Sequence, residues 1–252
     1  MTSIGSMSLL LMRRALRPFG LDLRRMGVTA PWLPANPAMD PVTYLYFVDL
    51  RHVPAIRIDI DRARLGVVAL PYNMACANPF ALAFEAAFGA RDEAAARSMV
   101  EAILSAYYES VQPADACAAL DVTPDEAPGL RDLPAPHWVA PWGTESVEER
   151  AWRTRLWAVK DGLSSTRLAT AKDGATAFGP VSARKLALEV ERTLKLARSI
   201  RNKGYRAGAY DAPEVFGLRA GEDYRWFVIR GQHRLAACAA AGIGTVAARV
   251  TK

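Results

Sequence analysis

Apolar and polar residues alternate in two short stretches of the first half of the chain. Residues 55–60 read Ala-Ile-Arg-Ile-Asp-Ile, and residues 66–70 continue the pattern. A period of two predicts strands with one buried face. Residues 79–90 and 92–111 instead place apolar residues three and four positions apart, which predicts amphipathic helices. The first half is therefore expected to combine strands with helices.

Prolines separate this part of the chain from the next one. Residues 112–141 are rich in proline and lead into the sequence Pro-Ala-Pro-His-Trp-Val-Ala-Pro-Trp. Because proline removes a backbone donor and restricts the residue before it, we expect a non-helical strap there. Residues 145–163 then predict a further helix. We interpret the chain as an N-terminal α+β region, residues 1–145, followed by a second domain, residues 146–252.

A long helix is predicted over residues 183–202. Ser182 is a suitable N-cap, because its hydroxyl can accept a hydrogen bond from an unpaired amide of the first turn. Gly204 suits the position just after the C-terminus of the helix. The apolar stripe of this helix consists of Leu186, Val190, Leu194, Ala197 and Ile200. We expect this stripe to pack against the core.

Three charged residues of the same helix, Lys185, Glu189 and Arg192, occupy positions i, i+4 and i+7. They therefore project from one narrow strip of the helix surface. Two interpretations are open. The strip is either an exposed ladder of ion pairs, each worth about 0.2–0.5 kcal/mol, or part of a binding site.

The last segment of the chain predicts a strand, a turn and a helix in direct succession. A mobile-looking stretch follows Tyr205, and a strand is then predicted over residues 224–229. A helix over residues 235–241 comes next, closed by Gly242, and residues 245–250 predict a final strand. Residues that can carry chemistry lie at the junction between the first of these strands and the helix.

The turn at this junction reads Gly231-Gln232-His233-Arg234. Free amides at a helix N-terminus, together with the positive end of the helix dipole, bind anions. Gly231 lets the backbone approach a ligand closely, Arg234 can form paired bonds to a phosphate, and His233 can donate to it or carry a proton. The alternative is a helix whose histidine and arginine only cap it or cover a neighbouring strand.

Residues 226–237, Trp-Phe-Val-Ile-Arg-Gly-Gln-His-Arg-Leu-Ala-Ala, followed by a Gly-Ile-Gly-Thr-Val strand, resemble the conserved box of the ParB/sulfiredoxin superfamily. Residues 199–205 resemble the end of the helix placed before that box. The resemblance covers residues 178–250. It implies a small mixed sheet with helices, in which the Gly-X-X-Arg turn binds the phosphates of a nucleotide. Members of the superfamily include CTP-binding partition proteins, ATP-dependent sulfiredoxins and free-serine kinases that use ADP or ATP.

This chain differs from some of these members at positions that are important for their function, and the differences limit which activity is expected. Sulfiredoxins carry a catalytic cysteine immediately before the histidine, where this chain has Gln232, and Cys238 lies further along the following helix. Partition proteins continue into a DNA-reading helix-turn-helix, whereas this chain ends at Lys252, so sequence-specific DNA binding is not expected. The free-serine kinases keep a Gly-X-His-Arg turn and place a glutamate, proposed as the base, before it. Glu189 is the best counterpart of that glutamate, and Glu191 is the second.

Charge and cysteine content add limits on partners and metals. The net charge is +6, and arginine outnumbers lysine among the 32 basic residues, which permits an anionic partner. Three cysteines without short spacing and only three histidines argue against a disulfide framework or a metal site held by protein ligands. We therefore expect no metal bound by the protein alone.

The N-terminal residues bear on localisation. No apolar run approaches the length of a membrane span, and no secretory signal is recognisable, so a cytoplasmic protein is expected. Residues 8–26 mix leucines with arginines. They either lie on an acidic membrane surface, which would make the protein membrane-peripheral, or pack their leucines on the body of the protein.

Together these features predict a nucleotide-dependent phosphotransferase or phosphohydrolase, using ATP, ADP or CTP with Mg²⁺ held mostly by phosphates and water. The expected catalytic residues are Glu189 as base, His233 and Arg234. The expected nucleotide- and phosphate-binding residues are Ser182, Lys185, Arg192, Gly231, Gln232, His233 and Arg234. Arg234 and the amides of Gly231 and Gln232 would hold the phosphate.

The acceptor is expected to be a small molecule or a glycan precursor. Residues 141–182 also resemble uncharacterised ParB-like proteins of bacterial surface-polysaccharide gene clusters, and this resemblance implies the glycan class. Two other functions stay open: a non-catalytic nucleotide-binding switch, and a ParB-like DNA-binding or nuclease protein. The oligomeric state is left open as well.

Overall fold

A computed structural model describes residues 56–68, 70–72, 78–138, 146–160, 173–205, 212–221 and 223–250. The segment 8–26, for which a membrane-surface role is one expectation, lies outside these residues. In the part of the chain that is described, no helix is both long enough and apolar enough to cross a membrane.

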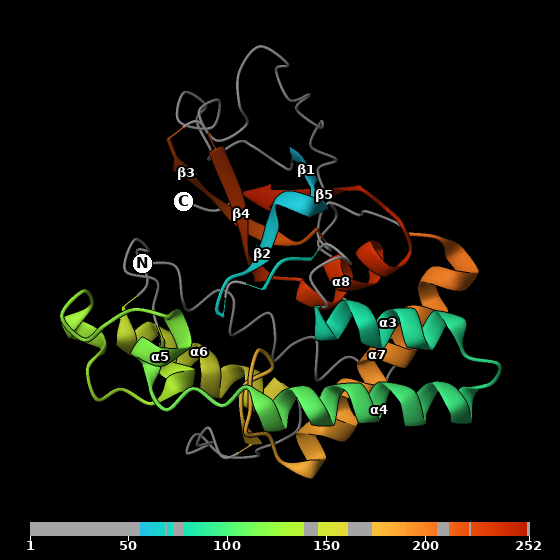
Figure 1. Cartoon of the computed structure of the whole chain (residues 1–252), viewed down its shortest axis with the longest axis horizontal. Coiled ribbons are helices and arrows are strands. Elements are labelled where there is room, and N and C mark those ends of the chain that lie inside the picture. The colour runs from blue at the N-terminus through green and yellow to red at the C-terminus, as the bar shows by residue number, and fades with distance from the viewer. Residues whose placement is uncertain are drawn as a thin grey trace, which may run out of the picture. The chain divides into compact units, whose positions relative to one another are not determined.

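Five strands form one mixed sheet in the order β1-β5-β3-β4-β2 (Figure 1). Their bounds are β1 (Ile56–Asp59), β2 (Ala63–Leu65), β3 (Glu214–Ala220), β4 (Asp223–Arg230) and β5 (Thr245–Val250). The pairs β1–β5 and β3–β4 are antiparallel, whereas β3–β5 and β2–β4 are parallel. This small mixed sheet and its helices confirm the expected mixture of strands and helices, and the strands expected at 55–60, 224–229 and 245–250 are present.

Two expectations about strands were wrong. The strand expected over residues 66–70 is a turn in the described positions, and β2 lies before it. Val68 has a φ of 55°, a left-handed conformation that a strand cannot contain. Conversely, β3 lies in the stretch that looked mobile. Gly217 interrupts its alternation, but its residues pair antiparallel with β4 from Glu214 to Ala220.

The helices among the described residues are α3 (Pro79–Gly89), α4 (Glu93–Ser110), α5 (Ala116–Leu120), α6 (Val147–Lys160), α7 (Ala183–Lys203) and α8 (Gln232–Ala240). All five predicted helices are confirmed. The expectation of a non-helical strap over residues 112–141 was wrong at α5, which lies within this proline-rich segment. It occupies a proline-free stretch there, and the side chain of Asp115 caps it by accepting from the amide of Ala118.

Caps define the ends of α7 as the sequence indicates. The hydroxyl of Ser182 accepts a hydrogen bond of 3.1 Å from the amide of Lys185. Gly204 follows the last helical residue with a φ of 66°, a conformation that glycine adopts without the steric cost of a Cβ atom.

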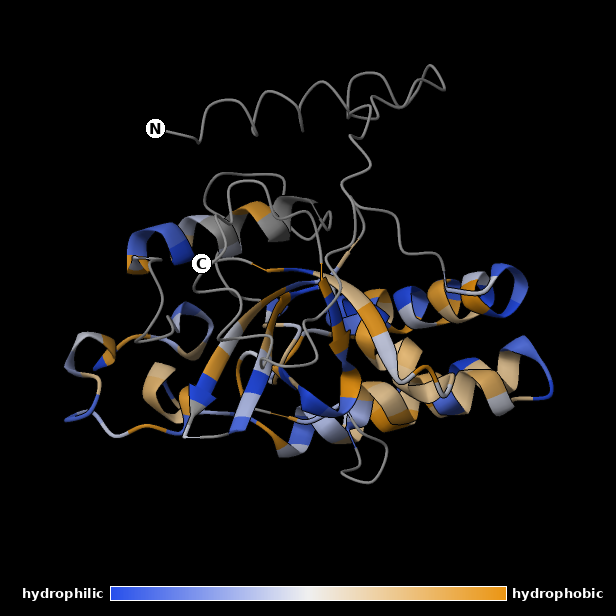
Figure 2. Cartoon of the chain, turned by 90° about the horizontal axis from the view of Figure 1, so that it is seen from above, coloured by the Kyte–Doolittle hydropathy of each residue, from blue (hydrophilic) through white to orange (hydrophobic). Residues whose placement is uncertain are grey.

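The main hydrophobic core lies between one face of the sheet and the helices α3, α4, α7 and α8. These helices pack against one another (Figure 1). Buried hydrophobic residues of strands and helices form one cluster, and hydrophobic positions recur along both kinds of element (Figure 2). The largest fully buried side chains of this core include Trp226, Phe80, Phe84, Leu104, Val190 and Leu235. The predicted stripe of α7 contributes to the core, with Leu186 only partly buried.

The expected boundary at residue 145 does not coincide with a break in the sheet. Strands β1 and β2 come from the first part of the chain and form the two edges of the sheet that β3, β4 and β5 complete. Residues 32–252 form one compact unit. The helices α3 and α4 thereby lie against α7 and α8, which positions residues from both parts beside one another.

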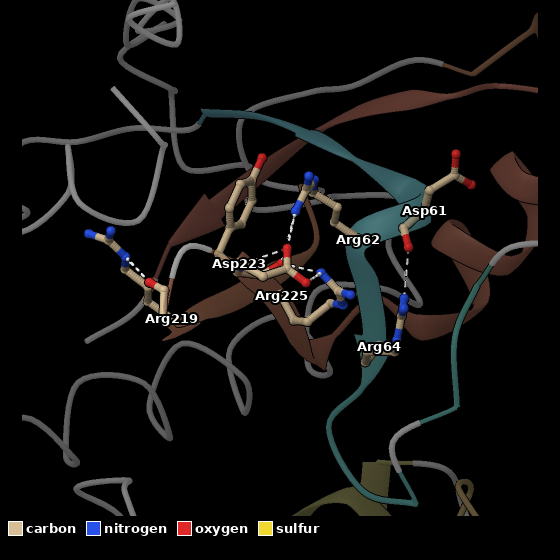
Figure 3. Close-up of polar contacts among 8 residues, drawn as sticks. Asp61, Arg62, Arg64, Arg219, Asp223 and Arg225 are labelled. Carbon is tan, nitrogen blue, oxygen red and sulfur yellow. Dashed lines mark hydrogen bonds and ion pairs between the residues drawn. The ribbon is translucent and has the colours of Figure 1, made fainter. Parts of the chain in front are cut away.

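One edge of the sheet is held by charged residues. Asp223 at the start of β4 lies between the guanidinium groups of Arg62 and Arg225, at 2.6 Å and 2.5 Å (Figure 3). Arg62 also lies over the ring of Tyr224, 4.3 Å from its centroid. All three charged side chains are well exposed, so these pairs contribute little energy. They connect the segment before β2 with the start of β4.

Candidate functional site

The turn between β4 and α8 has the geometry that the sequence predicts for an anion site. Gly231 is the N-cap of α8 with φ 89° and ψ 18°. A Cβ atom at this position would lie 2.9 Å from the Cα atom of Pro213, so only glycine fits without displacement. Glycine also provides no side-chain cap. The amides of Gln232 and His233, the first two residues of α8, lack an acceptor within the helix because of helix geometry.

The strip of charges on α7 is buried. Glu189 is fully buried, and the side chain of Lys185 is only 5% exposed. Oε1 of Glu189 lies 2.7 Å from Nζ of Lys185 and 2.9 Å from Nη1 of Arg192, and it accepts a hydrogen bond of 3.2 Å from the hydroxyl of Thr176. The interpretation as an exposed ion-pair ladder was wrong, because helices and loops from elsewhere in the chain cover this strip.

The buried carboxylate also faces the turn of α8. Oε2 of Glu189 lies 2.7 Å from Nε2 of His233. The alignment of this pair is poor for a hydrogen bond, so charge and proximity define the contact. The ring of Phe80 packs edge-on against the imidazole, with centroids 5.8 Å apart. The structure therefore brings together Glu189 and His233, which are distant in sequence, as well as Lys185 and Arg192. These four residues are called the Glu189 cluster below.

The electrostatics of the Glu189 cluster favour an ionised carboxylate. Burial by itself would raise the pKa of Glu189, but the neighbouring charges outweigh it. His233 has the largest lowering effect, followed by Lys185 and Arg192, and together they hold the pKa of Glu189 well below its ordinary value of 4.5. One carboxylate thus faces two permanent cations and an imidazole.

Thr176 and Tyr108, which the sequence did not single out, hold the carboxylate of Glu189 in place. Thr176 donates a hydrogen bond to Glu189, and Tyr108 donates one to Thr176. Thr176 lies in the loop before α7, and its carbonyl accepts a hydrogen bond of 2.9 Å from the hydroxyl of Tyr108 on α4. The neighbouring carbonyl of Ala177 accepts from the hydroxyl of Tyr107. Burial, and next the charge of Glu189, raise the pKa of Tyr108. No local sequence signal marks Thr176, since its role depends on a loop that packs against a distant helix.

The remaining predicted site residues are Gln232 and Arg234 on α8 and Ser182 at the start of α7. Gln232 and Arg234 are partly buried in the first turn of α8, and the amide of Arg234 donates to the carbonyl of Gly231 at 2.9 Å. Ser182 has both functions of its hydroxyl engaged at the cap of α7, since it also donates to Asp173 at 2.7 Å. Ser182 meets the Glu189 cluster through the backbone amide of Lys185, which donates to its hydroxyl at 3.1 Å.

The described residues contain no group of three or more His, Cys, Asp or Glu side chains placed to hold a metal ion. Glu189, whose carboxylate faces His233 of the turn, is engaged by cations and a hydroxyl, so it does not fit as a Mg²⁺ ligand. A Mg²⁺ ion at this site would be held by the phosphates of a nucleotide and by water.

Comparisons of the chain with protein-family models, with curated proteins and with solved structures found no match. The resemblance to the ParB/sulfiredoxin superfamily therefore stays a prediction from the residues themselves. The geometry of the α8 turn and of the Glu189 cluster does not depend on this resemblance, and a functional proposal can be argued from it.

Acid is expected to remove the stability that Glu189 contributes. In the unfolded chain this carboxyl titrates near 4.5, whereas its pKa in the folded protein is lower. The folded state then binds fewer protons, so the contribution is complete above about pH 4.5 and is lost progressively as the pH falls below it. Urea unfolding of the wild type and of Glu189→Gln, at about pH 7 and about pH 3, measures this effect. The difference between the two proteins should shrink in acid, and a constant difference would contradict the assignment.

Proposed function

We propose that the protein binds a nucleotide through its phosphates at the N-terminus of α8 and transfers a phosphoryl group to a hydroxyl of a small molecule or glycan precursor. The observation that supports this most is the coincidence of two features in one place. The N-terminus of α8 has amides without a side-chain cap, and it adjoins a largely buried cluster that contains Lys185, Arg192 and His233 around Glu189.

Phosphoryl transfer requires mainly positioning and neutralisation of charge. In the proposal, the amides of Gln232 and His233 and the guanidinium of Arg234 hold the terminal phosphates. Arg192, with its side chain 35% exposed, is the cation of the Glu189 cluster that a ligand can reach. Lys185 is buried, so it acts on the ligand through its positive potential.

The nucleotide is ATP, ADP or CTP, accompanied by Mg²⁺ on its phosphates. Neutralisation of the phosphate charge is the chemistry that Mg²⁺ supplies when bound. The protein residues bind the phosphate, orient it and exclude water on the side of α8. Burial of the Glu189 cluster strengthens each of these electrostatic interactions, since charges act over a longer range in a medium of low dielectric constant.

Thermal unfolding with a panel of ATP, ADP, CTP, GTP and nucleotide sugars, each with Mg²⁺, tests this proposal. A ligand that binds only the folded protein at a hundred times its Kd stabilises it by about 2.7 kcal/mol, so at least one nucleotide should raise the Tm. Arg234→Ala should abolish the shift. Arg230→Ala is the matched control, because Arg230 is an exposed arginine of β4 paired with Glu214, and it should retain the shift.

Two outcomes would lead to other conclusions. If no nucleotide raises the Tm, the proposal fails. If a nucleotide binds but no phosphorylated product or phosphate accumulates over many turnovers, the protein is a nucleotide-binding switch without catalysis.

A further inference from the structure

We infer that the proton acceptor of this site is His233, acting through Nδ1, and that Glu189 is a positioning residue that holds the imidazole in its Nε2–H tautomer. The catalytic part of this inference deepens the proposed phosphoryl transfer and rests on it. The tautomer is a property of the protein alone and is measurable without any ligand. This assignment differs from the expectation that Glu189 itself is the base.

The surroundings of Glu189 argue against a role as proton acceptor. Its side chain is fully buried, so an acceptor hydroxyl has no path to it in this conformation. One oxygen faces Lys185, Arg192 and Thr176, and the other faces His233. Protonation would leave two cations beside a neutral acid in a buried place, which is unfavourable. The carboxylate is instead held charged and fixed in position.

His233 has the properties that Glu189 lacks. Its side chain is 19% exposed, and it lies at the second position of α8, beside the amides proposed to hold phosphate. Nε2 faces Glu189 at 2.7 Å, so Nδ1 is the ring nitrogen that remains for a ligand. An anionic carboxylate next to Nε2 favours a proton on that nitrogen, which leaves the lone pair of the neutral ring on Nδ1.

Glu189 of α7 faces Nε2 of the imidazole, and Phe80 of α3 packs edge-on against the ring. Lys185 and Arg192 of α7 contact Glu189, and Tyr108 of α4 interacts electrostatically with the same carboxylate. Lys185 and Arg192 keep the carboxylate ionised, so a protonated imidazole does not pass its proton on to it. The pair with Nε2 is poorly aligned, as is common before a substrate is bound.

The reaction step follows from this arrangement. The acceptor hydroxyl gives its proton to Nδ1 of His233 while its oxygen forms a bond to the γ-phosphorus of ATP. The bond between that phosphorus and the β–γ bridging oxygen breaks, and ADP leaves with the electron pair. The resulting imidazolium is stabilised by Glu189 and returns its proton to water, so atoms and charge balance without a further reactant.

Nitrogen NMR of the protein labelled with ¹⁵N-histidine tests the tautomer directly. The chain has three histidines, so a His233→Gln spectrum assigns the signals of His233. In the neutral ring of the wild type, Nε2 should carry the proton and Nδ1 should show the shift of an unprotonated nitrogen. A predominant Nδ1–H tautomer would overturn the inference. This measurement needs no variant at Glu189, so it decides the matter even if such variants fail to fold.

Variants at Glu189 then test positioning. In Glu189→Gln the preference for the Nε2–H tautomer should fall by about tenfold or more, because a charge-assisted contact is replaced by a neutral one. Glu189→Asp should restore part of that preference. Glu191→Gln, on the exposed side of the same helix, should leave the tautomer ratio unchanged, and an unchanged ratio in Glu189→Gln would refute the positioning role.

The two proposals fail in distinguishable ways. If none of the nucleotides of the panel, each with Mg²⁺, changes the Tm or the signals of His233, nucleotide binding is refuted while the tautomer stands. If a nucleotide binds but the neutral ring carries its proton on Nδ1, the assignment of His233 as base is refuted while the binding site stands.

Discussion

Replacing Glu189 with glutamine is expected to lower the free energy of unfolding by about 3–5 kcal/mol, the cost typical of removing one partner from a buried ion pair. Glu189 is fully buried and faces Lys185, whose side chain is 5% exposed. Glutamine keeps the shape of the side chain but removes its charge, so the desolvated lysine ammonium loses the carboxylate that faces it at 2.7 Å. Urea unfolding at neutral pH, followed by circular dichroism, measures the change.

Glu191 provides a matched control on the same helix. Its carboxylate pairs with Arg97 at 2.5 Å, and both side chains are largely exposed. Glu191→Gln should therefore cost less than about 1 kcal/mol. If the two substitutions had equal effects, the buried cluster would not stabilise the protein as its geometry indicates.

Replacing Gly231 with alanine is expected to destabilise the protein by about 2–3 kcal/mol and, under the proposed function, to abolish nucleotide binding. Two costs add here. A non-glycine residue in the left-handed conformation, here with φ 89°, costs roughly 1–2 kcal/mol. The new Cβ atom would also lie 2.9 Å from the Cα atom of Pro213 and 3.0 Å from its Cβ atom, so the turn must move. Urea unfolding and the nucleotide thermal shift measure the two effects.

Alanine at position 242 would separate the conformational cost from the steric cost. Gly242 has a φ of 71°, and a Cβ atom there would meet nothing within 4 Å. Gly242→Ala should therefore show the conformational cost alone, about 1–2 kcal/mol, and should leave nucleotide binding intact. Equal losses in the two variants would show that Pro213 yields to the added methyl group.

Local signals located most helices correctly. The cap residues Ser182 and Gly204 mark the ends of α7 in the sequence, and both have the predicted function in the structure. Such signals succeed because a cap depends on the backbone of the same few residues. The short helix α5 was missed for a related reason, since prolines on both sides of it dominated the local pattern.

Strand pairing was predicted less well. The strand β3 contains Gly217 within its alternation and was taken as a mobile stretch, although it occupies the centre of the sheet. A strand is stabilised by partners distant in sequence, so its own residues carry only part of the information. The sequence likewise does not indicate that the period-two pattern ends in a turn, where Val68 has a left-handed conformation.

The sequence by itself determined the turn at Gly231–Arg234, the helix that follows it and the charged strip on α7, because each of these depends on residues close together in the chain. Only the tertiary structure decided that Lys185 and Glu189 are buried, that Glu189 faces His233, and that Thr176 and Phe80 complete the cluster. Spacing along a helix places side chains on one face, but the segments that pack over that face decide whether its charges meet water or one another.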